Sequence, residues 1–132
     1  MTDAIEKEIL AKGLTAQRVT PADLQSNIIS EHYFTAKDGV VGSFAADGFG
    51  VGEESQKEMD RTLGLLTFCV LVLKNGFTVT GESACASPEN FNAKIGNKIA
   101  RQNAEQKIWP LMGYELKERL HQMTLPSQAP SE

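Results

Sequence analysis

The sequence predicts an α+β fold, in which a small antiparallel sheet built on a β-hairpin packs against a long C-terminal helix. The hairpin is indicated by two runs of β-branched and aromatic residues, at about 65–74 and 77–84, that flank Asn75-Gly76. A long helix is indicated by the four-residue spacing of apolar positions after Ser87. The 132 residues are 41% apolar and 23% charged, which is typical of one soluble globular domain.

The N-terminal third predicts two short helices and a strand. Asp3 is a candidate N-cap for a helix over residues 3–12, and Thr20-Pro21 begins a second helix of about two turns whose apolar side includes Ile28 and Ile29. Residues 31–36 alternate weakly and predict a strand. Residues 37–62 contain five glycines and a polar run, which predicts a long mobile loop, either disordered or binding a ligand or partner.

The hairpin prediction assigns each strand residue to a face. A two-residue type I′ turn at Asn75-Gly76 pairs Lys74 with Phe77. The face expected to form the core contains Phe68, Val70, Val72, Lys74, Phe77, Val79, Gly81 and Ser83. The other face, expected to be half polar, contains Thr67, Cys69, Leu71, Leu73, Thr78, Thr80, Glu82 and Ala84. Such a face suits a site or a subunit contact, although a solvated surface is commoner.

The C-terminal part predicts two helices and a tail. Ser87-Pro88-Glu89 is typical of a helix start, because a hydroxyl N-cap precedes proline at N1. The predicted buried side contains Phe91, Ile95, Ile99, Ala100, Ala104 and Ile108. Trp109-Pro110 is expected to kink or end this helix, and residues 111–123 to form a terminal helix. We therefore expect one domain over residues 1–124 and a disordered tail over 125–132.

Composition and cysteine placement disfavour several classes of protein. A net charge of −4 argues against a basic nucleic-acid-binding protein. Cys69 and Cys85 form no CxxC motif and have no neighbouring histidine pair, so reduced thiols are expected, with no metal site and no cofactor. The longest apolar stretch, 63–73, is too short to span a membrane as a helix, and the charged N-terminus shows no signal peptide. We expect a cytoplasmic protein with no membrane association.

Six polar residues form the candidate ligand-binding set. On the long helix, Lys94, Lys98 and Arg101 follow steps of four and three, beside Asn97, and this basic stripe is able to neutralise phosphates. Thr80 and Glu82 on the second hairpin strand would read a polar edge of the ligand. The alternatives are that the helix charges are simply solvated and that Glu82 forms a structural ion pair.

No catalytic constellation is present in the pattern. Ser83 lies in Gly-Glu-Ser-Ala-Cys, which departs from the GxSxG nucleophile motif at its last position, and no histidine is placed to activate it. An enzyme with Glu82 as general base stays an alternative that would need this carboxylate in a closed pocket. The sequence therefore favours a protein that is not an enzyme.

Several short motifs resemble a family of small tailed-phage and prophage proteins, the gene-product-49/66 family. They are Asn75-Gly76-Phe77, Gly81-Glu82-Ser83-Ala84-Cys85, Asn90-Phe91, Ile95-Gly96, Lys98-Ile99-Ala100 and Ile108-Trp109-Pro110-Leu111. The resemblance covers about residues 63–120, and Ile29–Thr35 also looks like the family. It implies an accessory phage gene without an established activity, cofactor or catalytic residue.

Together these observations predict a non-enzymatic phage or prophage accessory binding protein in the host cytoplasm, expected to be a homo-oligomer. Its expected task is interference with a host process, such as counter-defence, by capture of a small anionic ligand such as a nucleotide. The alternative is a protein–protein interaction module that binds and inhibits a host protein.

Overall fold

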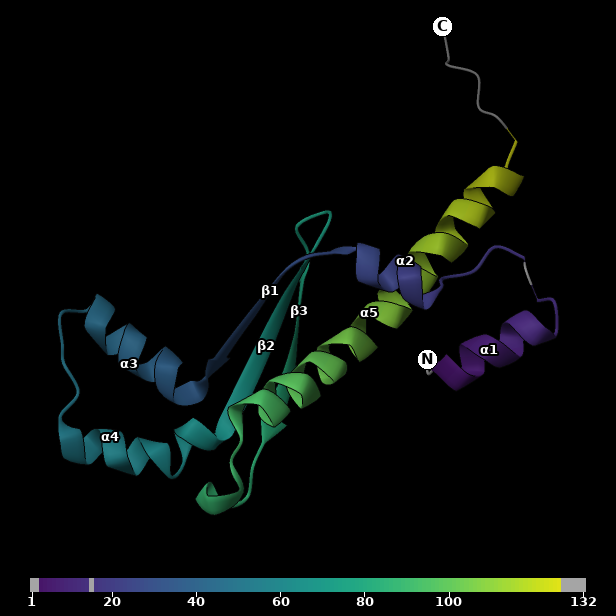
Figure 1. Ribbon diagram of the computed structural model, residues 1–132. Helices are drawn as coiled ribbons and strands as arrows, with labels where there is room; N and C mark the ends of the chain where they lie inside the picture. The colour runs from purple at the N-terminus through teal and green to yellow at the C-terminus, as the bar shows by residue number, and fades with distance from the viewer. Residues whose placement is uncertain (1–2, 15, 127–132) are drawn as a thin grey trace, which may run out of the picture. The chain divides into compact units, whose positions relative to one another are not determined.

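The computed structural model describes residues 3–14 and 16–126 and confirms the α+β class (Figure 1). A three-stranded antiparallel sheet, ordered β1-β2-β3, is accompanied by one long helix and several short ones. The elements are α1 (Asp3–Ala11), α2 (Pro21–Ser26), β1 (Ile28–Thr35), α3 (Ala36–Ala46), α4 (Glu53–Asp60), β2 (Leu66–Leu73), β3 (Thr78–Ala84) and α5 (Ala93–Thr124), with 3₁₀ turns η1 (Leu63–Leu65) and η2 (Pro88–Asn90).

Contacts group the chain into two compact units. The sheet unit comprises Asn27–Lys107, and the terminal unit comprises Met1–Ser26 and Ile108–Glu132. Because α5 runs through both units, this grouping does not by itself separate two domains, and one domain over residues 1–124 stays a prediction. Residues 127–132 of the expected tail lie outside the described residues.

In the terminal unit, reciprocal hydrogen bonds begin α2. The Asp23 backbone N–H donates to Thr20 Oγ1 at 3.1 Å, and Asp23 Oδ2 accepts from the Thr20 N–H at 3.0 Å, which lowers the pKa of Asp23. The expected helix 20–29 is too long, because α2 ends at Ser26 and Ile28 and Ile29 belong to β1. The helix over residues 3–12 is confirmed as α1.

The predicted mobile loop over 37–62 is wrong, because most of this segment forms α3 and α4. Thr35 caps α3 through a capping box with Asp38, which fixes a helix start immediately after β1. Lys37 of α3 pairs with Asp60 of α4 at 2.5 Å. The glycines suggested a loop, yet only Gly48, just beyond α3, has a positive φ.

The hairpin has a three-residue turn, so the predicted two-residue type I′ turn is wrong. The Leu73 N–H donates to the Phe77 carbonyl, and the Gly76 N–H donates to the Leu73 carbonyl, each at 2.8 Å. Within this turn Gly76 alone has a positive φ, of 88°, while Asn75 Oδ1 accepts from the Phe77 N–H at 2.9 Å. Cys69 therefore lies opposite Gly81, and the pairing differs by one residue from the predicted register.

This shift exchanges the two faces of β2, and the predicted core face is wrong. Thr67, Cys69, Leu71 and Leu73 are buried, whereas Leu66, Phe68, Val70 and Val72 are only partly buried. We call the face of Thr67, Cys69, Leu71, Leu73, Val79, Gly81 and Ser83 the inner face, and the face of Leu66, Phe68, Val70, Val72, Thr78, Thr80, Glu82 and Ala84 the outer face. Phe34 and His32 of β1 pair with Phe68 and Val70 and lie on the outer face.

Small residues bring α5 against the inner face. Gly96, Ala100 and Ala104 are its buried positions in the sheet unit, and a Cβ built on Gly81 would lie 2.0 Å from the Ala100 carbonyl oxygen. Ile95 and Ile99, predicted to be buried, are instead 57% and 42% exposed. The helix is therefore rotated by one position relative to the prediction, so that its small residues face the sheet. This orientation lets the backbones of α5 and β3 approach closely, and it leaves the larger isoleucine side chains exposed.

The long helix differs from its prediction at its start and at proline. Pro88–Asn90 form η2, and α5 begins at Ala93, where Asn92 Oδ1 accepts from the Ile95 N–H at 3.1 Å. Pro110 lies inside α5, which continues to Thr124, so a helix end at Trp109-Pro110 and a separate helix over 111–123 are wrong, while a kink there stays a prediction. A proline removes one backbone donor, and the residues on either side retain enough helical hydrogen bonds to continue.

Candidate functional site

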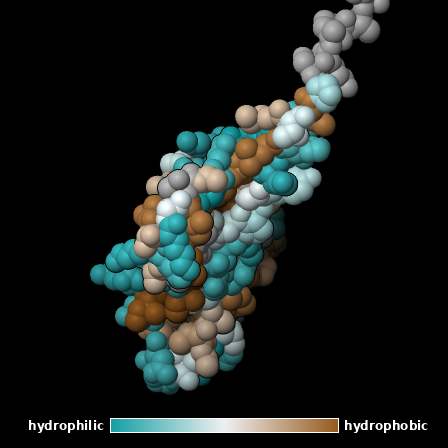
Figure 2. Space-filling view, turned by 90° about the vertical axis from the view of Figure 1, so that its right-hand side faces the viewer, coloured by the Kyte–Doolittle hydropathy of each residue, from teal (hydrophilic) through white to brown (hydrophobic). Residues whose placement is uncertain are grey.

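The outer face of the sheet presents a row of partly exposed apolar side chains. Leu66, Phe68, Val70 and Val72 form the central row, and Phe34, which is 39% exposed, stacks beside Phe68 with ring centroids 5.7 Å apart. Figure 1 shows α3 and α4 on the side of the sheet away from α5, and α3 contacts β1 and β2. Figure 2 shows the right-hand side of Figure 1, where apolar side chains also reach the molecular surface among polar ones. A polar border formed by Thr78, Thr80 and Glu82 follows β3.

Thr80 and Glu82 lie together at this border, as predicted. Their partners across β2 differ from the predicted ones by one residue. Thr80 Oγ1 donates to Glu82 Oε1 at 3.3 Å, and Lys107 Nζ of α5 donates to Thr80 Oγ1 at 3.4 Å. Asn103 Nδ2 donates to the Glu82 backbone carbonyl at 2.7 Å. Glu82 pairs across the sheet with Phe68, not with Cys69, and it is exposed. This geometry does not supply the closed pocket that a Glu82 general base would need.

The four predicted helix residues lie in different surroundings on α5. Arg101 forms ion pairs with Glu31 of β1 and with Glu105, whose Oε1 lies 2.8 Å from Arg101 Nε. Its guanidinium charge is therefore directed to two carboxylates, of which Glu31 lies on β1, at the opposite edge of the sheet from β3. Asn97 is partly buried, while Lys94 and Lys98 are exposed. Sequence spacing placed the cations on one helix but gave no sign of Glu31, which comes from β1.

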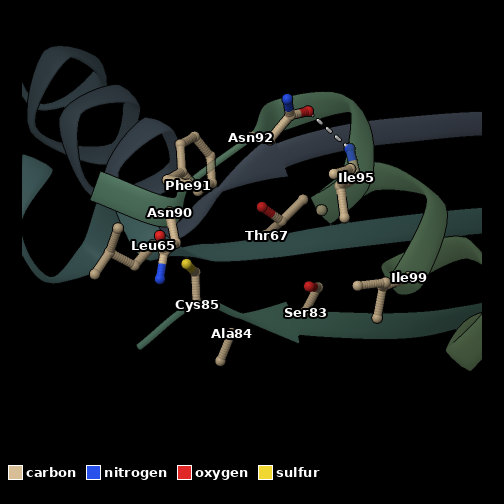
Figure 3. A pocket seen from close by; sticks show the side chains of 11 residues that line it. Leu65, Thr67, Ser83, Ala84, Cys85, Asn90, Phe91, Asn92, Ile95 and Ile99 are labelled. Atoms are coloured by element: carbon tan, nitrogen blue, oxygen red, sulfur yellow. Dashed lines mark hydrogen bonds between the residues drawn. The ribbon is translucent and has the colours of Figure 1, made fainter. Parts of the chain in front are cut away.

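A pocket lies where the ends of β2 and β3 meet η2 and the first turns of α5 (Figure 3). Its volume is about 140 Å³, and none of the side chains that line it is charged. The lining residues are Leu65, Thr67, Ser83, Ala84, Cys85, Asn90, Phe91, Asn92, Ile95, Gly96 and Ile99. Of these, Ser83 was expected to hydrogen-bond the backbone and not to act as a nucleophile, and neither Ser83 nor Thr67 nor Asn90 was predicted to bind a ligand. Ser83 and Thr67 become neighbours only in the observed register.

Cys69 and Tyr33 form a cross-strand pair on the inner face. Burial raises the pKa of the Cys69 thiol and, with a smaller contribution from the neighbouring thiol, that of the Tyr33 hydroxyl. A buried thiol with a raised pKa is a poor nucleophile at neutral pH. Cys69 and Cys85 are both free thiols, of which Cys69 is buried and Cys85 is only partly buried.

Two features are absent from residues 3–14 and 16–126. These residues contain no group of three or more histidine, cysteine, aspartate or glutamate side chains able to hold a metal ion. No helix in this part of the chain is long and apolar enough to cross a membrane.

Comparison with known proteins gives one result. No curated protein and no solved structure matches the chain. Residues 19–120 match the family described as phage protein (N4 Gp49/phage Sf6 gene 66), which extends the resemblance from the C-terminal half to most of the chain. The match includes the whole sheet unit, both faces of the sheet and the pocket. The chain therefore belongs to the N4 Gp49/phage Sf6 gene 66 family of phage proteins.

Proposed function

We propose that this phage protein is a non-enzymatic accessory protein of the host cytoplasm that binds and inhibits a host protein through the outer face of its sheet. The carrying observation is the apolar row Leu66, Phe68, Val70 and Val72, which stays partly exposed on the central strand. A contiguous exposed apolar surface with a polar border is typical of protein interaction sites.

The chemistry of the face defines the partner surface. Phe34 and Phe68 provide an aromatic anchor, and aromatic side chains are enriched among residues that dominate binding energy. Glu82 is an exposed carboxylate at the border, so it favours a partner that places a cation there. The proposed partner is a host protein with an apolar patch flanked by a lysine or arginine.

Capture of a small anion has less support from the geometry. Arg101, the last cation of the predicted stripe, already pairs with Glu31 and Glu105. A phosphate would have to compete with two carboxylates for its guanidinium group. Capture of a nucleotide through the basic stripe stays a prediction, and so does the homo-oligomer.

A photo-crosslinking phenylalanine analogue at position 70, tested in phage-infected cells, examines the outer face directly. The same analogue at position 49 is the matched control, because Phe49 is 65% exposed but lies between α3 and α4. We expect a host protein to be crosslinked from position 70 and not from position 49. Its affinity is then measured with both proteins purified, by calorimetry.

The affinity measurement uses variants that keep the fold. Val70→Thr combined with Val72→Thr preserves shape and β propensity, and should weaken binding about tenfold by removing apolar contact. Phe49→Ser should leave the affinity unchanged. Equal affinities for wild type and the double variant would overturn the proposal. A second result would also overturn the proposal: the analogue at position 70 crosslinks the chain to itself, and sedimentation shows a dimer that the double variant dissociates. In that case a second copy of the chain would occupy the outer face.

A further inference from the structure

We infer that the pocket between the hairpin end and the start of α5 binds a neutral pyrimidine ring, recognised by the hydroxyls of Thr67 and Ser83 and the amide of Asn90. This site lies on the inner face and is independent of the outer face that the proposed function uses.

The first support is the hydroxyl of Thr67, an almost fully buried residue, which has no partner among the residues that the structure describes. Thr67 is 2% exposed, and in the described part of the chain its Oγ1 has no hydrogen-bond partner. No fully buried side-chain oxygen or nitrogen in that part lacks a partner, so Thr67 Oγ1 must open onto the pocket. A hydroxyl held at the bottom of a pocket in this way is available to a ligand, because it need not break a bond within the protein.

The second support is the arrangement of polar groups around it. Ser83 lies directly opposite Thr67 across β2 and β3. Figure 3 shows both side chains on the same side of the sheet, with Cys85 and Asn90 at one end and Ile95 and Ile99 of α5 at the other. Hydroxyl and amide groups both donate and accept, which matches the alternating carbonyl and N–H groups on the edge of a pyrimidine such as uracil.

The third support is the size and charge of the space. A cavity of about 150 Å³ accommodates benzene, and this pocket, at about 140 Å³, is suited to one six-membered ring. Leu65, Phe91, Ile95 and Ile99 supply apolar contact for the ring, and the absence of charged lining side chains favours an uncharged ligand.

Gly96 keeps the space open. A Cβ on Gly96 would lie 3.1 Å from Thr67 Oγ1, which is closer than an ordinary van der Waals contact. A side chain at this position would therefore displace the hydroxyl that is proposed to hydrogen-bond the ligand. Gly113 lies on the same helix, and a Cβ there would meet nothing within 4 Å. The chain therefore offers a matched pair of glycine substitutions.

The test is titration of the full-length protein with uracil, followed by NMR of its methyl groups. We expect uracil to shift the Thr67, Ile95 and Ile99 signals saturably at millimolar concentration, and Thr67→Val to weaken binding about fivefold, the effect of one hydrogen bond. Gly96→Ala should abolish binding, whereas Gly113→Ala should leave it unchanged.

Uridine and uridine 5′-monophosphate distinguish the sources of the ring. Tighter binding of uridine than uracil identifies a nucleoside, and a further gain with the monophosphate that disappears at high salt identifies a nucleotide held by nearby lysines. The inference is overturned if uracil shifts none of the three signals. It is also overturned if benzene and uracil bind with equal affinity and Thr67→Val changes neither. A third contradicting result is an equal affinity of the Gly96→Ala and Gly113→Ala variants for uracil.

Discussion

The inner and outer faces of the same three-stranded sheet are built in opposite ways. On the inner face, glycine and alanine bring the α5 backbone against Gly81, and Cys69 and Leu71 are fully buried. On the outer face, Phe34, Phe68 and Val70 are larger or equally apolar, yet they stay partly exposed. Apolar character alone therefore does not decide which face of this sheet becomes the core. The position of glycine and alanine decides it, because these small residues permit the α5 backbone to approach the inner face.

The largest expected effect comes from filling the close contact between β3 and α5. In Gly81→Ala, the added Cβ would lie 2.0 Å from the Ala100 carbonyl oxygen and 2.3 Å from the Ala104 nitrogen, and both are backbone atoms. The helix must move, so we expect a loss of at least about 4 kcal/mol in the free energy of unfolding, above the usual cost of overpacking. Urea unfolding followed by circular dichroism measures it.

Gly113→Ala is the control, because it also adds a methyl group but meets nothing. It should raise the stability by up to about 1 kcal/mol through helix propensity. Similar stabilities for the two alanine variants would show that the inner face does not depend on the contact at Gly81.

Alanine truncation on the two faces of β2 compares them at neighbouring positions. Leu71 is fully buried, so Leu71→Ala should cost about 3 kcal/mol from lost burial and a cavity. Val70 is partly exposed, and Val70→Ala should cost about 1 kcal/mol. The difference between these costs, measured by urea unfolding, checks the assignment of faces, and a larger cost at Val70 would reverse it.

A smaller effect is expected at alkaline pH. The ordinary pKa values of the Cys69 thiol and the Tyr33 hydroxyl are 9.0 and 10.0, and burial raises both in the folded state. Above about pH 9 the unfolded chain releases these protons before the folded chain does, so stability falls as pH rises. Unfolding measured from pH 7 to 10.5 should show this slope. The double variant Cys69→Ala, Tyr33→Phe should lose most of it, and an unchanged slope would contradict burial of the pair.

The sequence was sufficient for the elements whose signals are local. The capped start of α2 at Thr20, the two hairpin strands and the α+β class were all predictable, because caps and β-branched runs act within a few residues. The loop predicted over 37–62 failed because the capping box of Thr35 with Asp38 outweighs a high glycine content.

The candidate site was harder to predict because it depends on tertiary contacts. Thr80 and Glu82 were placed together by alternation along β3, but the pairing of Arg101 with Glu31 joins residues 70 positions apart. The pocket around Thr67 depends on register and on where α5 begins, and both predictions were wrong. A one-residue error in a turn therefore moved every β2 side chain to the wrong face, whereas Val79, Gly81 and Ser83 of β3 lie on the core side as predicted.

The turn that sets this register makes the smallest but most diagnostic prediction. Gly76 has a φ of 88°, so Gly76→Ala should cost about 1 kcal/mol, because an L side chain disfavours that conformation. Asn75 has no positive φ and holds the Phe77 N–H through its side chain, so Asn75→Gly should also destabilise, by about 1 kcal/mol. In a two-residue type I′ turn the same Asn75→Gly change would be neutral or favourable, since both central residues then need positive φ. A stability equal to or above that of wild type would therefore favour the two-residue turn, in which the inner and outer faces of β2 are exchanged.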